Sequence, residues 1–340
     1  MSGFTVGVAI LGGLVLAVLV AWNAWTTRQL KPRQADQALP RNEPGEEPVP
    51  VEPVFDAEEP PLPMPEKKPG LDALIDALAP IAVEHPVAGE AAMAALPATR
   101  RAGSKPFAVE GLNEATQQWE VPQAGQRYTA FQAGVQLANR TGALNEIEFS
   151  EFVVKAQAFA DAVNGAAEFP DMLPEVARAR ELDQFAGGHD AQLSFTLRAR
   201  NAAWSPGYVQ QNASRFGFVA GAIPGRLVLP SSQAGNPPLL VLSFDSHAAL
   251  SEDPAQSAIR EVSLSLDVPQ VPRGEQPFAR MRDAAIGLAA GMDGAIIDDN
   301  GQVIAAEGLD VVGADLEMLY DTLESRDLAA GSPQARRLFS

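Results

Sequence analysis

The chain opens with one long hydrophobic stretch, from Phe4 to Trp25, that contains no charged residue. About 20 helical residues, each rising about 1.5 Å, span the hydrocarbon core of a bilayer. The run therefore predicts a transmembrane helix within residues 1–27, with tryptophans near one end, where their rings favour the membrane interface. The side chains expected to face lipid are Phe4, Ile10, Leu14, Leu16, Leu19, Trp22 and Trp25.

A cleaved signal peptide is the alternative interpretation of this run. It is disfavoured because no basic residue precedes the run, the run is longer than an ordinary signal-peptide core, and no clear cleavage site follows. Three basic residues follow instead: Arg28, Lys31 and Arg33. Since loops rich in Lys and Arg remain in the cytoplasm, we expect an N-terminus outside the membrane and a cytoplasmic remainder.

Residues 28–106 are predicted to be a disordered linker. Between Pro32 and Pro69, prolines recur every few residues and alternate with glutamates and aspartates. Proline favours extended chain, like charges repel, and few large apolar side chains are present to bury. We expect a spacer here, interrupted only by one short amphipathic helix over residues 71–80.

Residues 107–188 have the mixed pattern of an α/β segment. Tyr128, Phe131, Val135 and Ala138 recur at helical spacing, whereas apolar residues alternate with polar ones between Leu144 and Phe149. The elements predicted are strands over 116–121 and 144–149, and helices over 128–141, 152–163 and 173–185.

Residues 189–330 have clearer signals. Leu193, Phe195 and Leu197 alternate with polar residues, which predicts a half-buried strand. Ser205-Pro206 is typical of a helix start, and Gly217 of its end. The elements predicted are strands over 192–197, 218–229, 239–244 and 262–268, helices over 205–216, 278–292 and 309–323, and a hairpin over 295–305 that turns at Asp299-Asn300-Gly301.

These strands have one apolar and one polar face, and the helices suffice to cover only one face. The fold class expected is α+β: a transmembrane helix, a disordered linker, and an antiparallel sheet with helices on one face and an open face. Residues 331–340 are expected to be a tail. A short internal echo links Glu120-Val121-Pro122 with Asp267-Val268-Pro269, and Gly142-Ala143 with Gly294-Ala295. Divergent duplication and coincidence both explain the echo.

Composition excludes several function classes. The 340 residues include no Cys and carry a net charge of -18, which excludes thiolate chemistry and disfavours nucleic-acid binding. The histidines His85, His189 and His247 lie outside metal-ligand spacings, and Asp298-Asp299 precedes a turn. We expect no catalytic residue, metal, cofactor or small-molecule substrate. An enzyme whose site shows no sequence motif is the competing class.

Several segments, taken in order, resemble one known family. They are the strand Leu193–Leu197, the turn Gly217–Gly221, the strand Val262–Val268 with Pro269, the helix after Phe278, and the segment Gly294–Asp299. With the anchor and linker, they make residues 189–330 similar to the ZipA family of bacterial cell-division proteins. The resemblance leaves residues 107–188 uncovered.

The resemblance implies a single-pass protein of the bacterial inner membrane at the division site. It would bind the C-terminal tail of the tubulin-like FtsZ through the open sheet face and tether the division ring. The site residues so implied are Gln192, Ser194, Thr196, Val219, Ile223, Val241, Ser243, Asp245, His247, Ser263 and Ser265.

The implied site departs from the family, because several of these positions are large and apolar in the family and polar here. Either the strand register assumed is shifted by one residue, which would exchange the two faces, or this cleft is more polar. A membrane-tethered scaffold that binds a different cytoplasmic partner, through residues 107–188, is the alternative function.

Overall fold

The computed structural model describes residues 33–34, 70–250, 257–298, 301–304 and 306–340. The predicted anchor and most of the predicted linker lie outside these residues. The chain divides into two compact units. Unit 1 contains Gln192–Asp267 and Gly274–Leu316, with residues 33–34 from its N-terminal part. Unit 2 contains 70–191 of the described residues, Val268–Arg273 and Glu317–Ser340.

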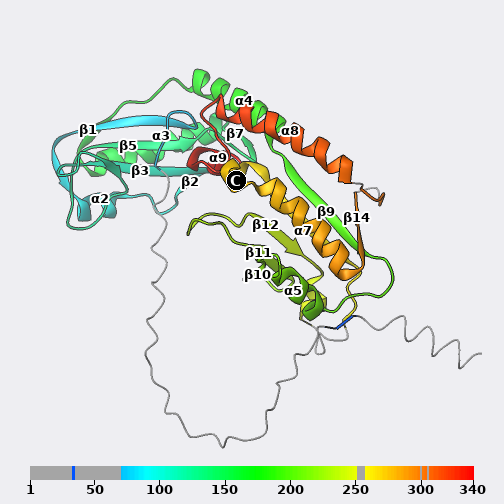
Figure 1. Ribbon diagram of the computed structural model, residues 1–340. Helices are drawn as coiled ribbons and strands as arrows, with labels where there is room; N and C mark the ends of the chain where they lie inside the picture. The colour runs from blue at the N-terminus through cyan, green and yellow to red at the C-terminus, as the bar shows by residue number, and fades with distance from the viewer. Residues whose placement is uncertain (1–32, 35–69, 251–256, 299–300, 305) are drawn as a thin grey trace, which may run out of the picture. The chain divides into compact units, whose positions relative to one another are not determined.

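Unit 2 is built on an antiparallel sheet with the strand order β2-β3-β5-β1-β8, and β4 also pairs with β3. Figure 1 shows β1, β5 and β3 side by side. Its elements are β1 (Asp76–Ala88), α2 (Gly89–Ala95), β2 (Arg101–Ala102), β3 (Lys105–Asn113), β4 (Trp119–Glu120), β5 (Arg127–Gln136), β6 (Ala138–Asn139), β7 (Gly142–Ala143), α3 (Glu146–Ala162), β8 (Gly165–Ala167), α4 (Met172–His189) and α9 (Pro333–Leu338).

The core of unit 2 is a cluster of aromatic rings between the sheet and α3. Phe131 of β5 meets Phe159 of α3 edge to face, with ring centroids 5.2 Å apart, and Phe107 of β3 lies 6.1 Å from Phe152. α3 begins at Glu146 because Asn145 and Glu148 form a reciprocal capping box. The helix is thereby placed with its aromatic side against one face of the sheet.

The C-terminal residues close unit 2. Arg337 donates to both carboxylate oxygens of Asp76, at 2.8 and 2.5 Å, and Asp76 is fully buried. Burial raises the pKa of Asp76 above its usual range, and the Arg337 guanidinium opposes that rise. Gln136 also donates to the Arg337 carbonyl. Residues 331–340, predicted to be a tail, therefore form part of this unit.

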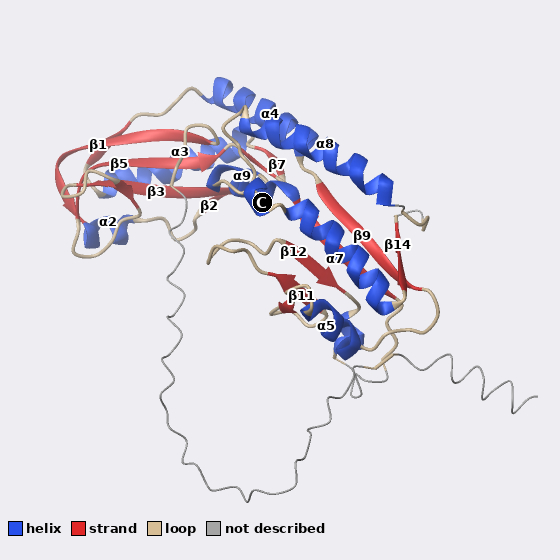
Figure 2. Ribbon diagram, viewed as in Figure 1, coloured by secondary structure: helices blue, strands red, loops and turns tan. Residues whose placement is uncertain are grey.

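Unit 1 is also an antiparallel sheet, with the order β10-β11-β12-β13-β9-β14. Helix α7 contacts β14, β13 and β9, and Figure 2 shows it running along these strands. The elements are β9 (Gln192–Ala199), α5 (Pro206–Ser214), β10 (Val219–Ala220), β11 (Arg226–Leu229), β12 (Leu240–Ser243), α6 (Ser246–Ala249), β13 (Glu261–Asp267), α7 (Pro277–Met292), β14 (Gly294–Ile297) and α8 (Ala306–Glu324), whose last residues belong to unit 2.

The two units share one topology. The central strand order β3-β5-β1-β8 of unit 2 corresponds to β12-β13-β9-β14 of unit 1. A helix follows β1 in unit 2 and β9 in unit 1. After β5 and after β13, each unit continues with a long helix, a short strand and a second long helix. Before the short strand, Asn164-Gly165 and Asp293-Gly294 each place a left-handed residue, at φ 51° and 55°, ahead of a glycine. The two units therefore repeat one topology, but the sequence echo aligned the wrong residues, because β1–α4 matches β9–α8.

The α+β class with antiparallel sheets is confirmed. The strands and helices predicted in residues 189–294 and 309–323 have counterparts, including the Ser205 cap and the left-handed Gly217. Of the hairpin predicted over 295–305, Ile297 forms an antiparallel bridge with Val303, and the turn residues Asp299 and Asn300 lie outside the described residues. Two predictions in unit 2 are wrong: residues 128–141 are mostly strand β5 rather than helix, and helix α3 begins inside the predicted strand over 144–149. In β5 the buried side chains also fit a period of two, and pairing with β1 and β3 on either side selects the strand.

The predicted linker extends too far. Residues 70–106 are folded, and β1, predicted as a short helix and linker, is a central strand paired with β5 and β8. Pro80 has no N–H to donate to a neighbouring strand. None is needed toward β8, because β8 ends at Ala167, and the Pro80 carbonyl still accepts the Glu168 N–H. Proline content in this segment therefore does not indicate disorder, since its apolar residues complete the core of unit 2.

Candidate functional site

Strand register places most of the predicted site residues on one face of the unit 1 sheet. One cross-strand row contains Val219, Val228, Val241, Ser265 and Ser194, and the next contains Arg226, Ser243, Ser263, Thr196 and Ile297. Gln192 lies at the end of β9 opposite Asp267. The alternate residues, such as Phe195 and Leu264, point into the core. The assumed register was therefore right for these strands.

Three predicted site residues lie elsewhere. Ile223 is in the turn between β10 and β11 and is 56 % exposed. Asp245 caps α6 by accepting the His247 N–H at 2.9 Å, so both residues lie beyond the end of β12. Val228, Arg226 and Arg198, which sequence reasoning missed, share the face; the period-two alternation of β9 and β11 was the signal for them.

Hydroxyl groups line the part of the unit 1 face over β9 and β13, whereas Val219, Val228 and Val241 lie over β10, β11 and β12. The Ser194 and Ser263 hydroxyls are 2.8 Å apart, and the Ser265 hydroxyl donates to the Val241 carbonyl at 3.3 Å. At the far end, Arg198 donates to Glu261 at 2.6 Å. Of the two interpretations open at the sequence level, the more polar face is the one that the structure supports.

The corresponding face of unit 2 has a different chemistry. Its first row pairs Leu78 with Gly134 and Gly134 with Ala108, and another pairs Ala82 with Ala130 and Ala130 with Leu112. Between them lie Pro80, Gln132 and Glu110. Sequence reasoning missed this face because it assigned the strands to a linker and a helix.

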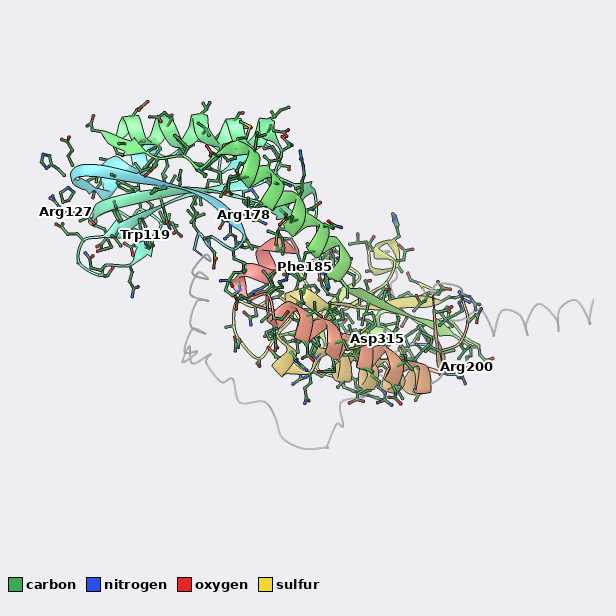
Figure 3. All side chains as sticks on the ribbon, turned by 90° about the horizontal axis from the view of Figure 1, so that it is seen from above. Trp119, Arg127, Arg178, Phe185, Arg200 and Asp315 are labelled. Atoms are coloured by element: carbon green, nitrogen blue, oxygen red, sulfur yellow. The ribbon has the colours of Figure 1, made fainter. Side chains whose placement is uncertain are left out.

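A cavity of about 230 Å³ lies in unit 2 beside α4. It is lined in part by Leu74, Arg178, Phe185 and Arg326, and Figure 3 shows Arg178 and Phe185 along α4. Arg178 donates to the Ala73 and Asp76 carbonyls, at 3.1 and 2.7 Å, and Arg326 lies over the Phe185 ring. Both guanidinium groups thus contact other parts of unit 2.

The described residues contain no group of three or more His, Asp or Glu side chains that could hold a metal ion. Among the predicted turn and histidine residues, Asp298 accepts the Gln302 N–H at 2.8 Å and His189 stacks on Phe185. Lys105 is buried, and its ammonium donates to Asn139 and Thr141. Burial lowers the pKa of Lys105 from its usual range, and its ammonium also donates to the Gly142 carbonyl.

Arg33 is the one predicted topology residue that lies within the described chain. Its backbone forms a parallel bridge with Trp204, and its guanidinium donates to Asp293 at 2.8 Å. Asp293 follows the C-terminal end of α7, so a cation here also complements the helix dipole. Arg28, Lys31 and the seven anchor residues lie outside the described chain, and within it no helix is both long and apolar enough to cross a bilayer.

No protein-family model matches this chain, and a search of curated proteins found no match. The candidate site consists of two sheet faces of equivalent topology, one in each unit.

Proposed function

We propose that this protein is a membrane-anchored cell-division adaptor. It binds the C-terminal tail of FtsZ through an open sheet face and tethers the division ring to the bacterial inner membrane, with its N-terminus in the periplasm. Residues 4–25 anchor it, and Arg28, Lys31 and Arg33 set its orientation. It binds no nucleic acid and catalyses no reaction.

One observation supports this proposal: unit 1 contains, in the expected order, the strands and helices on which the sequence resemblance rests. The strand at Gln192–Ala199, the glycine turn after α5, the strand Glu261–Asp267, helix α7 and the short strand after it occur in the expected order. Most side chains on one face of this sheet are buried, whereas those on the other, apart from Ile297, are exposed or half-buried. Such a face can receive an extended peptide.

A direct test is a titration of residues 29–340 with a fluorescent peptide that copies the C-terminal tail of the host's FtsZ. Residues 70–106 must be kept, because β1 is a central strand of unit 2. Saturable binding at micromolar concentration supports the adaptor, since many weak sites along a polymer act by avidity. A folded protein with no affinity at hundreds of micromolar would contradict it.

A membrane-tethered scaffold with a different cytoplasmic partner is the second candidate. The observation that favours it is unit 2 itself, a complete second copy of the fold with its own sheet face. Immunoprecipitation of the full-length protein from cells depleted of FtsZ separates the two, because the scaffold keeps its partner there and the adaptor does not.

A further inference from the structure

The cavity beside α4 is formed by segments of unit 2 that lie far apart in the sequence. One side of α4 contributes residues at helical spacing, which are Arg178, Glu181, Leu182 and Phe185. The short segment before β1 and the segment after α8 complete the wall. Figure 3 shows Arg178 and Phe185 on α4, where this wall lies. The cavity is therefore a feature of the folded unit rather than of one loop.

The interior of the cavity is apolar. Leu328 is 1 % exposed, and Leu182 and Phe185 are half-buried. The Phe185 ring is held in place by stacking on His189, with ring centroids 4.2 Å apart. An apolar cavity of about 150 Å³ holds benzene, which has six carbon atoms. The cavity of about 230 Å³ therefore suits an apolar group of about nine carbon atoms.

An unpaired cation, Arg326, lies at this cavity. Arg326 is exposed, and its guanidinium carbon lies 5.1 Å from the centre of the Phe185 ring. Stacking occupies the flat face of a guanidinium and leaves its N–H donors available in the plane. Within the described chain, no hydrogen bond or ion pair engages this side chain. Arg178 differs, because it donates to two carbonyls and pairs with Glu175 at 2.8 Å. Arg326 is therefore the cation that a ligand can reach.

An unpaired anion lines the same cavity. Glu181 is exposed, and no Lys or Arg of the described residues forms an ion pair with it. A ligand with only a negative charge would meet Glu181 as well as Arg326, and a ligand with only a positive charge would meet the reverse. A ligand that carries both charges and an apolar group complements all three features.

We propose that this cavity binds a free amino acid with a large apolar side chain, for which phenylalanine has a suitable size. The carboxylate of the ligand pairs with Arg326 and its ammonium group with Glu181. The apolar side chain enters between Leu182, Phe185 and Leu328. This site is separate from the two sheet faces and does not depend on the proposed function.

The experiment titrates the full-length protein in phosphatidylcholine nanodiscs by saturation-transfer NMR, with empty nanodiscs as the blank. The probes are L-phenylalanine, 3-phenylpropanoate, which lacks the ammonium group, and phenethylamine, which lacks the carboxylate. We expect phenylalanine to bind with a Kd on the order of 1 mM. Each of the other probes should bind at least about threefold more weakly, because it loses one ion pair.

Two variants test the charges separately. Arg326→Gln should weaken phenylalanine and 3-phenylpropanoate at least about threefold without weakening phenethylamine. Glu181→Gln should weaken phenylalanine and phenethylamine by a similar factor without weakening 3-phenylpropanoate. The control is Arg180→Gln, which removes an exposed pair with Glu146 from the same helix and should change each Kd by less than about twofold.

Thermal melting confirms that each variant is folded. The proposal is overturned if the folded protein shows no saturable binding of phenylalanine up to about 20 mM. It is also overturned if 3-phenylpropanoate binds as tightly as phenylalanine, or if the losses in the two variants do not follow the charge of the probe. None of these results bears on the binding of the FtsZ tail, which its own titration tests.

Discussion

Units 1 and 2 have the same order of central strands, yet their polar side chains lie in different places. Unit 1 puts hydroxyl groups on its sheet face and keeps its ion pairs, such as Arg198–Glu261, exposed. Unit 2 has small and apolar side chains on either side of Gln132 and Glu110 on its sheet face, and it buries a carboxylate, Asp76, against Arg337. A shared backbone topology therefore constrains neither the chemistry of the open face nor the interactions that stabilise the unit.

The largest difference is expected when the buried ion pair of unit 2 is broken. Arg337→Ala leaves Asp76 fully buried without its cation, which should lower the free energy of unfolding by about 3 kcal/mol. Urea denaturation of residues 29–340, followed at Trp119 in unit 2, measures it. The control is Arg282→Ala in unit 1, which breaks an exposed pair with Asp310 and should cost less than about 1 kcal/mol. Equal losses of unfolding free energy in the two variants would contradict the distinction between a buried ion pair in unit 2 and an exposed one in unit 1.

The same pair gives unit 2 a pH dependence. The pKa of Asp76 is raised in the folded state from 3.8, chiefly by burial. A folded acid with a raised pKa contributes stability that is complete below 3.8 and is lost as pH rises through the folded value. Removal of Arg337 takes away the group that lowers this pKa, so the deficit of Arg337→Ala should shrink as pH falls. Denaturation midpoints between pH 7 and pH 4 test this, and a constant deficit would count against it.

A smaller effect is expected in unit 1 from Arg33→Ala. The substitution removes a half-exposed ion pair with Asp293 and a cation at the end of α7. A loss of about 1 kcal/mol is expected, measured at Trp204, which Arg33 pairs with. Asp293→Asn should reproduce part of the loss. If Trp119 reported the larger change, the placement of Arg33 in unit 1 would be wrong.

The smallest effect is expected on the hydroxyl-lined face. Ser194→Ala removes the bond to Ser263 on an exposed surface and should change stability by less than about 0.5 kcal/mol. Gly111→Ala, on the buried face of unit 2, provides the contrast, because its Cβ would lie 2.4 Å from the Tyr128 ring. Thermal melting compares them. Equal shifts in melting temperature would mean that the cost of a substitution does not depend on which face of the sheet carries it.

Sequence reasoning succeeded where one local signal agreed with the tertiary environment. In unit 1, Ser205 caps a helix and Leu193, Phe195 and Leu197 alternate, so elements and most face residues could be placed. It failed in unit 2 where local patterns fit two periods, as in β5, or where prolines lie within a central strand, as in β1. The capping box of Asn145 and Glu148 was a readable helix signal that alternation at 144–149 obscured.

The candidate site was only partly predictable for the same reason. Alternation identified which strand residues share a face, but it could not show that Asp245 turns into α6. Nor could it reveal the face of unit 2, since that face exists only when β1, β3 and β5 pair over distances of up to 60 residues.

The bridge between Arg33 and Trp204 has a mechanical consequence for a protein anchored as proposed. Tension between the bilayer and unit 1 would pass through the few residues after Trp25 and load one parallel bridge and one ion pair in shear. The Arg33 contacts would therefore break at a lower force than the strand pairs of unit 1.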